Sequence, residues 1–215
     1  MAKNFVSNKD ESVRMFEHPI LDVMSRVHWS TPLVFWVPVV LYCLYAGIAG
    51  GTGWFTPLIY AAALAFWTLA EYILHRFIFH YEPTSSWGKR LHFLSHGVHH
   101  DYPNDSKRLV MPPLLAAPLA ATFFALFYVV LGSPVSYVFF AGFLTGYLIY
   151  DMMHYALHHS TFDNAFWREM KQHHMIHHYH DPEHGFGVSS KMWDYVFRTT
   201  FNIQKKDTTS VSGVE

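Results

Sequence analysis

The sequence predicts an all-α integral membrane protein: four transmembrane helices in two hairpins, with a cytoplasmic helical cap holding a histidine-rich dimetal site. Hydrophobic residues make up 51% of the 215 residues and charged residues only 14%, against roughly 25% charged in soluble domains. Four apolar segments approach the length of about 20 residues that a membrane-crossing helix needs. Ten of the 17 histidines fall into four clusters, each where an apolar run meets polar sequence.

The apolar segments predict the spans and their direction. They cover residues 31–50, 54–74, 112–131 and 134–153. Short glycine-containing turns at 50–53 and 132–133 join them in pairs, which indicates helical hairpins. All 15 Lys and Arg lie outside these turns, so the positive-inside rule puts both termini and every histidine cluster on the cytoplasmic side. We expect an N-terminal arm at 1–30, a membrane domain at 31–200 and a polar tail at 201–215.

Composition excludes several other classes of protein. The net charge of −1 and the lack of a basic stripe give no reason to expect nucleic-acid binding. The single cysteine, Cys43, lies inside an apolar run, so no intrachain disulfide and no thiolate metal motif is expected. The 7 Trp and 13 Tyr are typical of a chain that meets the membrane–water interface.

The histidine clusters predict a site for two metal ions. Their ten members are His75, His80, His96, His99, His100, His154, His158, His174, His177 and His178. Imidazole binds Zn, Fe, Cu and Ni, and one ion takes only about four to six ligands. Ten histidines are therefore too many for one ion and suit two.

Spacing within each cluster predicts which side chains converge. Positions i, i+3 and i+4 share one face of a helix, so 96, 99 and 100 are expected to converge, as are 174, 177 and 178. His154 and His158 form a pair. His75 and His80 would point about 140° apart on a straight helix, so they serve different metals or the helix ends near Arg76.

Two acidic residues accompany the clusters. Glu71 precedes His75 by four residues, and Asp151 precedes His154 by three. A buried carboxylate there can accept the free ring N–H of a ligand and fix its tautomer. The alternative is a carboxylate that reaches interfacial water.

Other polar and aromatic residues near the clusters have two interpretations. Five aromatic residues either line an acyl entrance or anchor the chain at the interface: Tyr81, Tyr102, Tyr155, Tyr179 and Trp193. Five further histidines either support the site or face solvent: His92, His159, His173, His180 and His184.

The clusters resemble the histidine boxes of the fatty acid hydroxylase superfamily, the membrane-bound non-haem di-iron enzymes. The matching stretches are HRFIFH (75–80), HGVHHDYPNDSKRLVMPP (96–113), HYALHH (154–159), HHMIHH (173–178) and GFGVSSKMWDYVF (185–197). Over residues 65–200 the chain is most similar to fatty acid 2-hydroxylases that act on sphingolipid acyl groups. The resemblance implies that the ten histidines bind two Fe ions, that O2 is the co-substrate, and that C2 of a free fatty acid or ceramide is hydroxylated.

The sequence departs from that family pattern at three positions. Arg198 stands where a glycine is expected, and His180 and His184 are additional. Relatives often carry a fused cytochrome b5 domain, whereas only about 30 residues precede the first span here. We therefore expect a separate electron donor of the cytochrome b5, ferredoxin or reductase type, and a bacterial inner membrane ahead of the endoplasmic reticulum.

Three rival functions stay open. A related enzyme could hydroxylate or desaturate another carbon, as sterol- and carotenoid-modifying members do. A metal transporter or buffer would place ligands along a path through the bilayer, yet the first and third segments contain no histidine. A hydrolase with two zinc ions has a similar ligand set, and zinc in a purified sample would not decide the matter because Zn binds such ligands at least as well as Fe(II).

Overall fold

The computed structural model describes residues 4–202, and all regular secondary structure in that range is helical. The predicted all-α class with four spans is confirmed. The chain forms two compact units. We call one the span unit (Arg14–Ala70 and Val110–Met152) and the other the histidine unit (residues 4–13, 71–109 and 153–202 of the described chain). Most of the predicted polar tail lies outside the described residues.

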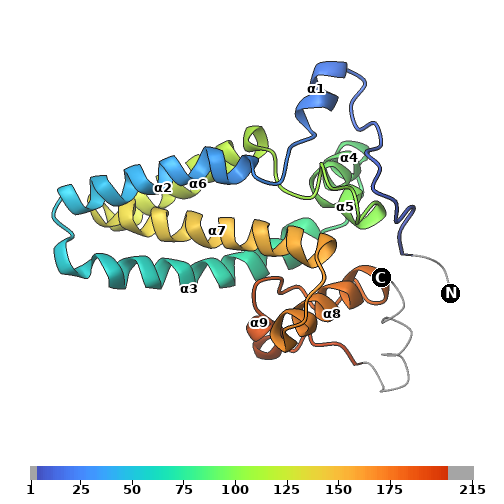
Figure 1. Cartoon of the computed structure of the whole chain (residues 1–215). Helices are drawn as coiled ribbons and strands as arrows, with labels where there is room; N and C mark the ends of the chain where they lie inside the picture. Colours follow the sequence, from blue (N-terminus) through green and yellow to red (C-terminus); the bar gives the residue numbers. More distant parts are fainter. Residues whose placement is uncertain (1–3, 203–215) are drawn as a thin grey trace. The chain divides into compact units, whose positions relative to one another are not determined.

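Four long helices dominate Figure 1, and each is long and apolar enough to cross a membrane. They are α2 (Thr31–Ala49), α3 (Thr56–Leu74), α6 (Pro113–Leu131) and α7 (Val135–His159). Their starts and ends match the predicted spans closely, except that α7 continues six residues past 153, the predicted end. This extension places His154 and His158 on the last turns of a continuous helix.

Shorter elements complete the chain. A short helix α1 (Pro19–Met24), which the sequence did not predict, interrupts the N-terminal arm. The others are a 3-10 turn (Gly53–Phe55), π-helical turns at His75–Phe79 and Phe93–Gly97, and helices α4 (Ser86–His92), α5 (Val98–Asp101), α8 (Ala165–Tyr179) and α9 (Met192–Val196).

Both hairpin turns depend on glycine. Gly51 has φ 103° and Gly132 has φ 67°, a left-handed region that side chains rarely adopt. The Thr52 hydroxyl donates to the Gly47 carbonyl oxygen at 3.0 Å, which satisfies one of the free carbonyls at the end of α2. The turns are therefore as tight as the sequence predicts.

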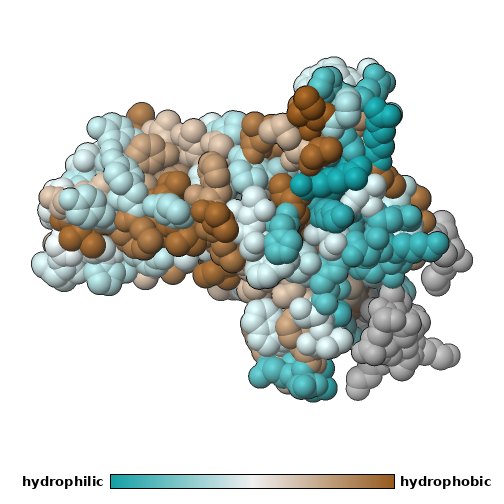
Figure 2. All heavy atoms as spheres, turned by 45° about the horizontal axis from the view of Figure 1, so that its top comes forward, coloured by the Kyte–Doolittle hydropathy of each residue, from teal (hydrophilic) through white to brown (hydrophobic). Residues whose placement is uncertain are grey.

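The span unit has a core rich in aromatic residues, and it leaves many apolar side chains exposed on its outside. Its core includes Trp36, Trp67 and Cys43, whose exposed fractions are 4%, 7% and 4%. By contrast Val34 and Val129 are 75% and 83% exposed. Figure 2 shows brown, apolar side chains along the outer surface of these helices. Such a surface is what a lipid environment covers, and the protein is an integral membrane protein.

Two glycines on α7 let it approach α3 closely. A Cβ added at Gly142 would lie 2.5 Å from the Tyr60 carbonyl oxygen and 2.8 Å from the Ala63 Cβ. A Cβ at Gly146 would lie 2.5 Å from the Trp67 Cβ. The spacing Gly-x-x-x-Gly is the small-residue pattern that lets membrane helices pack backbone to backbone, and the sequence analysis overlooked it.

The N-terminal residues belong to the histidine unit. The Val6 and Ser7 amides donate to the Asp101 carbonyl oxygen at 2.9 and 3.1 Å. The Tyr179 hydroxyl donates to the Asn8 Oδ1 at 2.6 Å, and the Tyr179 ring meets Phe5 edge-on at 5.2 Å. Tyr179, predicted near a substrate entrance, is thus engaged with the N-terminal segment.

Candidate metal centre

The ten clustered histidines gather in the histidine unit as two groups of five. Group one is His75, His80, His96, His100 and His177; group two is His99, His154, His158, His174 and His178. Within each group the potential ligand atoms all lie within 4.8 Å of one another. Each group could hold one metal ion.

A π-helical turn brings His75 and His80 into the same group. The His80 amide donates to the His75 carbonyl oxygen at 3.2 Å, a bond five residues long that widens the turn. The ring centroids are consequently 5.0 Å apart. Of the two alternatives that the sequence offered, the structure follows the second: the α-helix ends close to Arg76, at Leu74, and the two histidines do not belong to different groups.

Each triplet divides between the two groups instead of converging on one point. Positions i and i+4 differ by about 40° around a helix, whereas i+3 lies about 60° to the other side of i. The i, i+4 pairs therefore stay together: 96 with 100, 154 with 158, and 174 with 178. The i+3 members, His99 and His177, reach the opposite group. Because sequence neighbours such as His99 and His100 serve different groups, the two groups lie side by side.

The ligand atoms face one another at metal-ligand spacing. In group one the Nε2 atom of His96 lies 3.2 Å from that of His75 and 3.0 Å from that of His100. In group two the Nε2 atom of His174 lies 2.9 Å from that of His158 and 3.2 Å from that of His178. Metal–imidazole bonds of about 2.1 Å put two ligand atoms of one ion about 3.0 to 3.4 Å apart.

Hydrogen bonds on the other ring nitrogen leave Nε2 without a proton at two ligands. His75 donates from Nδ1 to the Phe186 carbonyl oxygen at 2.5 Å, and His177 donates from Nδ1 to the His184 carbonyl oxygen at 2.7 Å. A neutral imidazole then presents a lone pair at Nε2. Since lone pairs that face each other repel, a cation between them fits this donor set.

Burial keeps the imidazoles neutral. It lowers the pKa of His80 to about 2 and that of His100 to about 3, and neighbouring histidines lower both pKa values further. The pKa of His99, His174 and His178 is likewise held well below its usual value, first by burial and then by nearby imidazoles. Metal binding requires neutral imidazole, so the ligands need not lose a proton first.

The two predicted carboxylates have well-defined partners. Glu71, 4% exposed, accepts from the Val188 and Ser189 amides at 2.8 Å each and from the Ser189 hydroxyl. Asp151, 2% exposed, accepts from the Tyr147 hydroxyl at 3.1 Å and from the Met111 amide. Glu71 thus holds the backbone that precedes α9.

Asp194 is a site residue that the sequence analysis missed. It is fully buried and accepts from the Phe186 and Gly187 amides at 2.9 Å each and from the Thr199 hydroxyl at 2.8 Å. The Nε2 atom of His173 lies 3.1 Å from the Asp194 Oδ2. His173 is one of the five further histidines for which the sequence allowed either a supporting role or a solvent-facing position. Asp194 lies in the stretch GFGVSSKMWD, which carries the family resemblance, and that is the signal in the sequence that could have found it.

The remaining candidates lie nearer the surface. Tyr81 is 64% exposed, Tyr155 packs on the exposed His159 at 4.6 Å, and Trp193 stacks on Phe197 at 5.8 Å. His180 is exposed and Tyr102 is partly buried.

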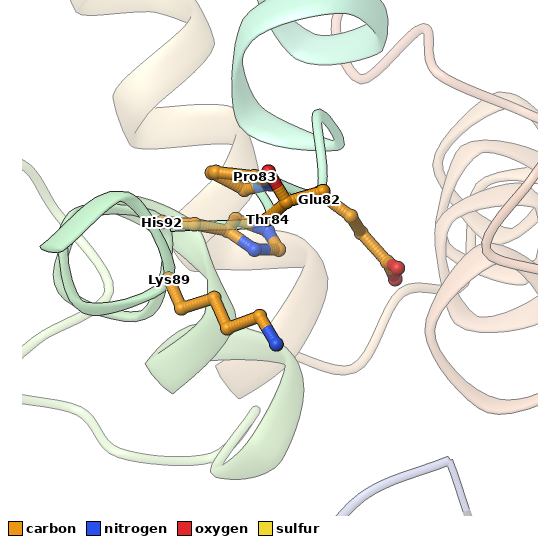
Figure 3. Close-up of a pocket in the computed structure, with 5 residues that line it drawn as sticks. All are labelled: Glu82, Pro83, Thr84, Lys89 and His92. Atoms are coloured by element: carbon orange, nitrogen blue, oxygen red, sulfur yellow. The ribbon is translucent and has the colours of Figure 1, made fainter. Parts of the chain in front are cut away.

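A polar cavity lies beside α4. Its volume is about 400 Å³, and it is lined by Glu82, Pro83, Thr84, Lys89 and His92 (Figure 3). Figure 3 shows Lys89 and His92 projecting from α4 below the 82–84 loop. Four of its five lining residues are polar, including an acidic and a basic one, so this cavity is unsuited to an acyl chain.

Arg198 has a backbone conformation that favours glycine. Its φ is 57°, in the left-handed region, which costs an L-residue about 1–2 kcal/mol. The glycine expected at this position from the resemblance would relieve that strain.

We expect Arg198→Gly to raise the stability of the protein by about 0.5–1 kcal/mol, because glycine's larger entropy in the unfolded chain offsets part of the relieved strain. Thermal unfolding in detergent would show a rise in Tm of about 1–4 °C. Arg198→Ala is the matched control, since it removes the side chain and keeps the strain. An equal gain in both variants would contradict the backbone explanation.

Four apolar spans and two adjacent groups of five histidines define a class of protein: integral membrane proteins with histidine groups that could hold metal ions. The sequence model of the fatty acid hydroxylase family matches residues 60–199. The chain belongs to the fatty acid hydroxylase family.

Characterised relatives cover most of the chain. It is 35% identical over 209 residues to fatty acid 2-hydroxylase from Mus musculus, covering 87% of this chain and 56% of that one. It is 34% identical to a dihydroceramide fatty acyl 2-hydroxylase from Arabidopsis thaliana, covering 88% and 80%. The solved hydroxylase domain of Scs7p has a TM-score of 0.81 at 40% identity, with 85% of this chain and 70% of that one covered. The chain spans about half the length of the mammalian relatives it matches.

Proposed function

We propose that this chain is a membrane enzyme that hydroxylates C2 of fatty acyl chains, in free fatty acids or in sphingolipids such as ceramide. The observation that carries the proposal is the pair of adjacent histidine groups whose Nε2 atoms face one another at 2.9–3.2 Å. Relatives in this family are named as fatty acid 2-hydroxylase, dihydroceramide fatty acyl 2-hydroxylase and ceramide very long chain fatty acid hydroxylase.

The two groups would hold two iron ions, with all ten histidines as ligands. Iron in such a centre supplies the O2 chemistry that replaces a C–H bond by C–OH. Zinc binds the same ligands at least as well as Fe(II), so its presence in a purified sample is compatible with an iron enzyme.

The residues of the chain hold and shield this centre. They present neutral imidazoles, fix the rings of His75 and His177 through Nδ1 hydrogen bonds to the Phe186 and His184 carbonyl oxygens, and bury eight of the ten histidines. Glu71 supports this arrangement through the backbone at Val188 and Ser189. We assign the equivalent supporting role near His154 to Asp151.

The position of the ligands along the chain favours C2. His75 directly follows α3, and His154 and His158 end α7, so both sets come at the ends of apolar spans. The carbon next to a lipid carboxyl or amide group lies at this depth. The Lys and Arg distribution orients both termini and the histidines toward the cytoplasm. The positive-inside rule applies both to the bacterial inner membrane and to the endoplasmic reticulum, and we expect the protein to reside in the bacterial inner membrane.

The overall reaction needs a reductant. One acyl C–H, O2, two electrons and two protons yield one C–OH and one water. A cytochrome b5, ferredoxin or reductase would supply the electrons. The aromatic residues Tyr81, Tyr102, Tyr155, Tyr179 and Trp193 remain our candidates for the acyl entrance.

Mass spectrometry of total and amide-linked fatty acids tests the proposal. Cells that express the chain, supplied with iron, oxygen and a sphingolipid, should accumulate 2-hydroxy acyl chains. Cells with the His177→Ala variant or the empty vector should not, while His180→Ala, an exposed position on the same segment, should match the wild type. A hydroxyl or double bond at another carbon would overturn the assignment of C2.

A further inference from the structure

The segment from His184 to Ser189, here called the carbonyl segment, faces group one with two backbone carbonyl oxygens. The His184 carbonyl oxygen accepts from Nδ1 of His177 at 2.7 Å, and the Phe186 carbonyl oxygen accepts from Nδ1 of His75 at 2.5 Å. Both histidines belong to group one. The backbone of this segment thus sets the tautomer and the ring angle of two of the five ligands.

Two buried carboxylates hold the carbonyl segment by four consecutive peptide N–H groups. Asp194 accepts from Phe186 and Gly187, each at 2.9 Å. Glu71 accepts from Val188 and Ser189, each at 2.8 Å. Hydrogen bonds to a charged acceptor are about twice as strong as neutral ones, so these carboxylates lock a stretch of chain that has no helix or strand of its own.

Gly187 makes this close approach possible. A Cβ at that position would lie 2.1 Å from the Ser190 carbonyl oxygen and 2.9 Å from the Asp194 Oδ2. Asp194 is itself fixed, because it accepts from the Thr199 hydroxyl at 2.8 Å and contacts His173 at 3.1 Å. The position of the segment is therefore determined from both sides.

Three of the five histidines of group two have no such support among the described residues. The Nδ1 atoms of His158, His174 and His178 are buried and have no hydrogen-bond partner within residues 4–202. When Nε2 binds a metal, Nδ1 must carry the proton, and a buried N–H without an acceptor is unfavourable. A hydrogen bond from Nδ1 to a carbonyl oxygen has the opposite effect, since it raises the basicity of the ligand.

We propose that Glu71 and Asp194 are positioning residues that act through the carbonyl segment on group one alone, and that this makes the two metal sites inequivalent. Group one binds its ion more tightly, and group two is the site that empties first. The inference rests on the proposed function only in requiring that both groups bind metal. It assigns Asp194 and Glu71 to one site of the pair.

Metal titration of the purified full chain in detergent tests this inference. The chain is stripped by a chelator and titrated with Co(II) alone, without lipid, and bound metal is measured by absorption and by elemental analysis. Wild type should bind two ions in two resolved steps. The tighter step should disappear in His100→Ala, a group-one variant, and the weaker step in His158→Ala, a group-two variant.

Asp194→Asn should weaken only the tighter step, by about 10–100-fold, the loss typical of removing an outer hydrogen-bond partner. Glu71→Gln should do the same through the other end of the segment, which keeps the test decisive if Asp194→Asn fails to fold. Glu169→Gln is the matched control, because its side chain is 64% exposed and pairs with Lys191, and both steps should be unchanged.

Two steps of equal affinity in the wild type would overturn the inference. So would an equal weakening of both steps in Asp194→Asn and Glu71→Gln, which is what a general loss of structure produces. Because no lipid is present, two resolved steps in a chain that makes no 2-hydroxy product would sink the proposed function and leave this inference standing. Binding of fewer than two ions by wild type would contradict both.

Discussion

Replacing His158 by alanine is expected to abolish hydroxylation, whereas the same change at His159 leaves it nearly intact. The two residues are neighbours at the end of α7, yet their surroundings differ. His158 is 8% exposed, and its Nε2 atom lies 2.9 Å from that of His174. His159 is exposed and packs on Tyr155. Only the first belongs to a ligand group.

The magnitude follows from the role of the side chain. Loss of an outer partner of a metal ligand costs about 10–100-fold in metal affinity or activity, so loss of a ligand itself should cost at least about 100-fold. Product formation by His158→Ala should therefore fall below detection, while His159→Ala stays within about 2-fold of wild type. The measurement is 2-hydroxy acyl product per unit of purified protein with a supplied electron donor.

Metal content separates a lost ligand from a misfolded chain. His158→Ala should retain about one ion per chain, at group one, and should elute as a monodisperse species beside wild type. Wild-type activity in His158→Ala, or an equally large loss of activity in His159→Ala, would contradict the assignment of His158 as a metal ligand and of His159 as a residue outside the metal centre.

The sequence was sufficient to predict the spans and the histidines that gather. Apolar length, glycine turns and charge asymmetry define α2, α3, α6 and α7 to within a few residues. The clusters name the ten side chains that form two groups of five. These predictions succeeded because burial in lipid and the density of imidazoles leave few alternative arrangements.

The arrangement inside the centre could not be predicted from spacing. On a regular α-helix the side chains of His75 and His80 would point in different directions. The π-helical turn at His75–Phe79 brings them to the same side. An ideal helix places i, i+3 and i+4 roughly on one face. Successive residues such as His99 and His100 still point about 100° apart, and in a site with two groups this difference places them in different groups. Such differences of angle are set by tertiary packing, which a single sequence does not reveal.

The supporting residues are concealed for a different reason. Asp194 acts through the peptide N–H groups of Phe186 and Gly187. Every residue type except proline has a peptide N–H group, so the sequence does not reveal this contact. Gly142 and Gly146 were visible as a Gly-x-x-x-Gly spacing, but glycine in a long apolar helix has no chemistry that draws attention. Both roles depend on backbone contacts rather than on side-chain motifs.

Gly142→Leu is expected to destabilise the span unit strongly. A Cβ at this position would lie 2.5 Å from the Tyr60 carbonyl oxygen, which belongs to the backbone of α3 and cannot rotate away. It would also lie 2.8 Å from the Cβ of Ala63, which is fully buried. The two helices must therefore separate, which also strains the hydrogen bond from the Tyr60 hydroxyl to Thr145 at 2.8 Å.

Overpacking of a tight interface typically costs about 1–3 kcal/mol, and a leucine forced against a backbone oxygen belongs at the upper end. For a chain of this size that corresponds to a fall in Tm of about 4–10 °C, measured by thermal unfolding in detergent. Ala125→Leu is the matched control, because it adds the same side chain at an exposed position on α6 and should leave Tm within about 1 °C. Equal Tm values for the two variants would show that α3 and α7 do not rely on Gly142 for their approach. A lower Tm for Gly142→Leu alone would establish that backbone-to-backbone packing, in addition to the aromatic core, stabilises the span unit.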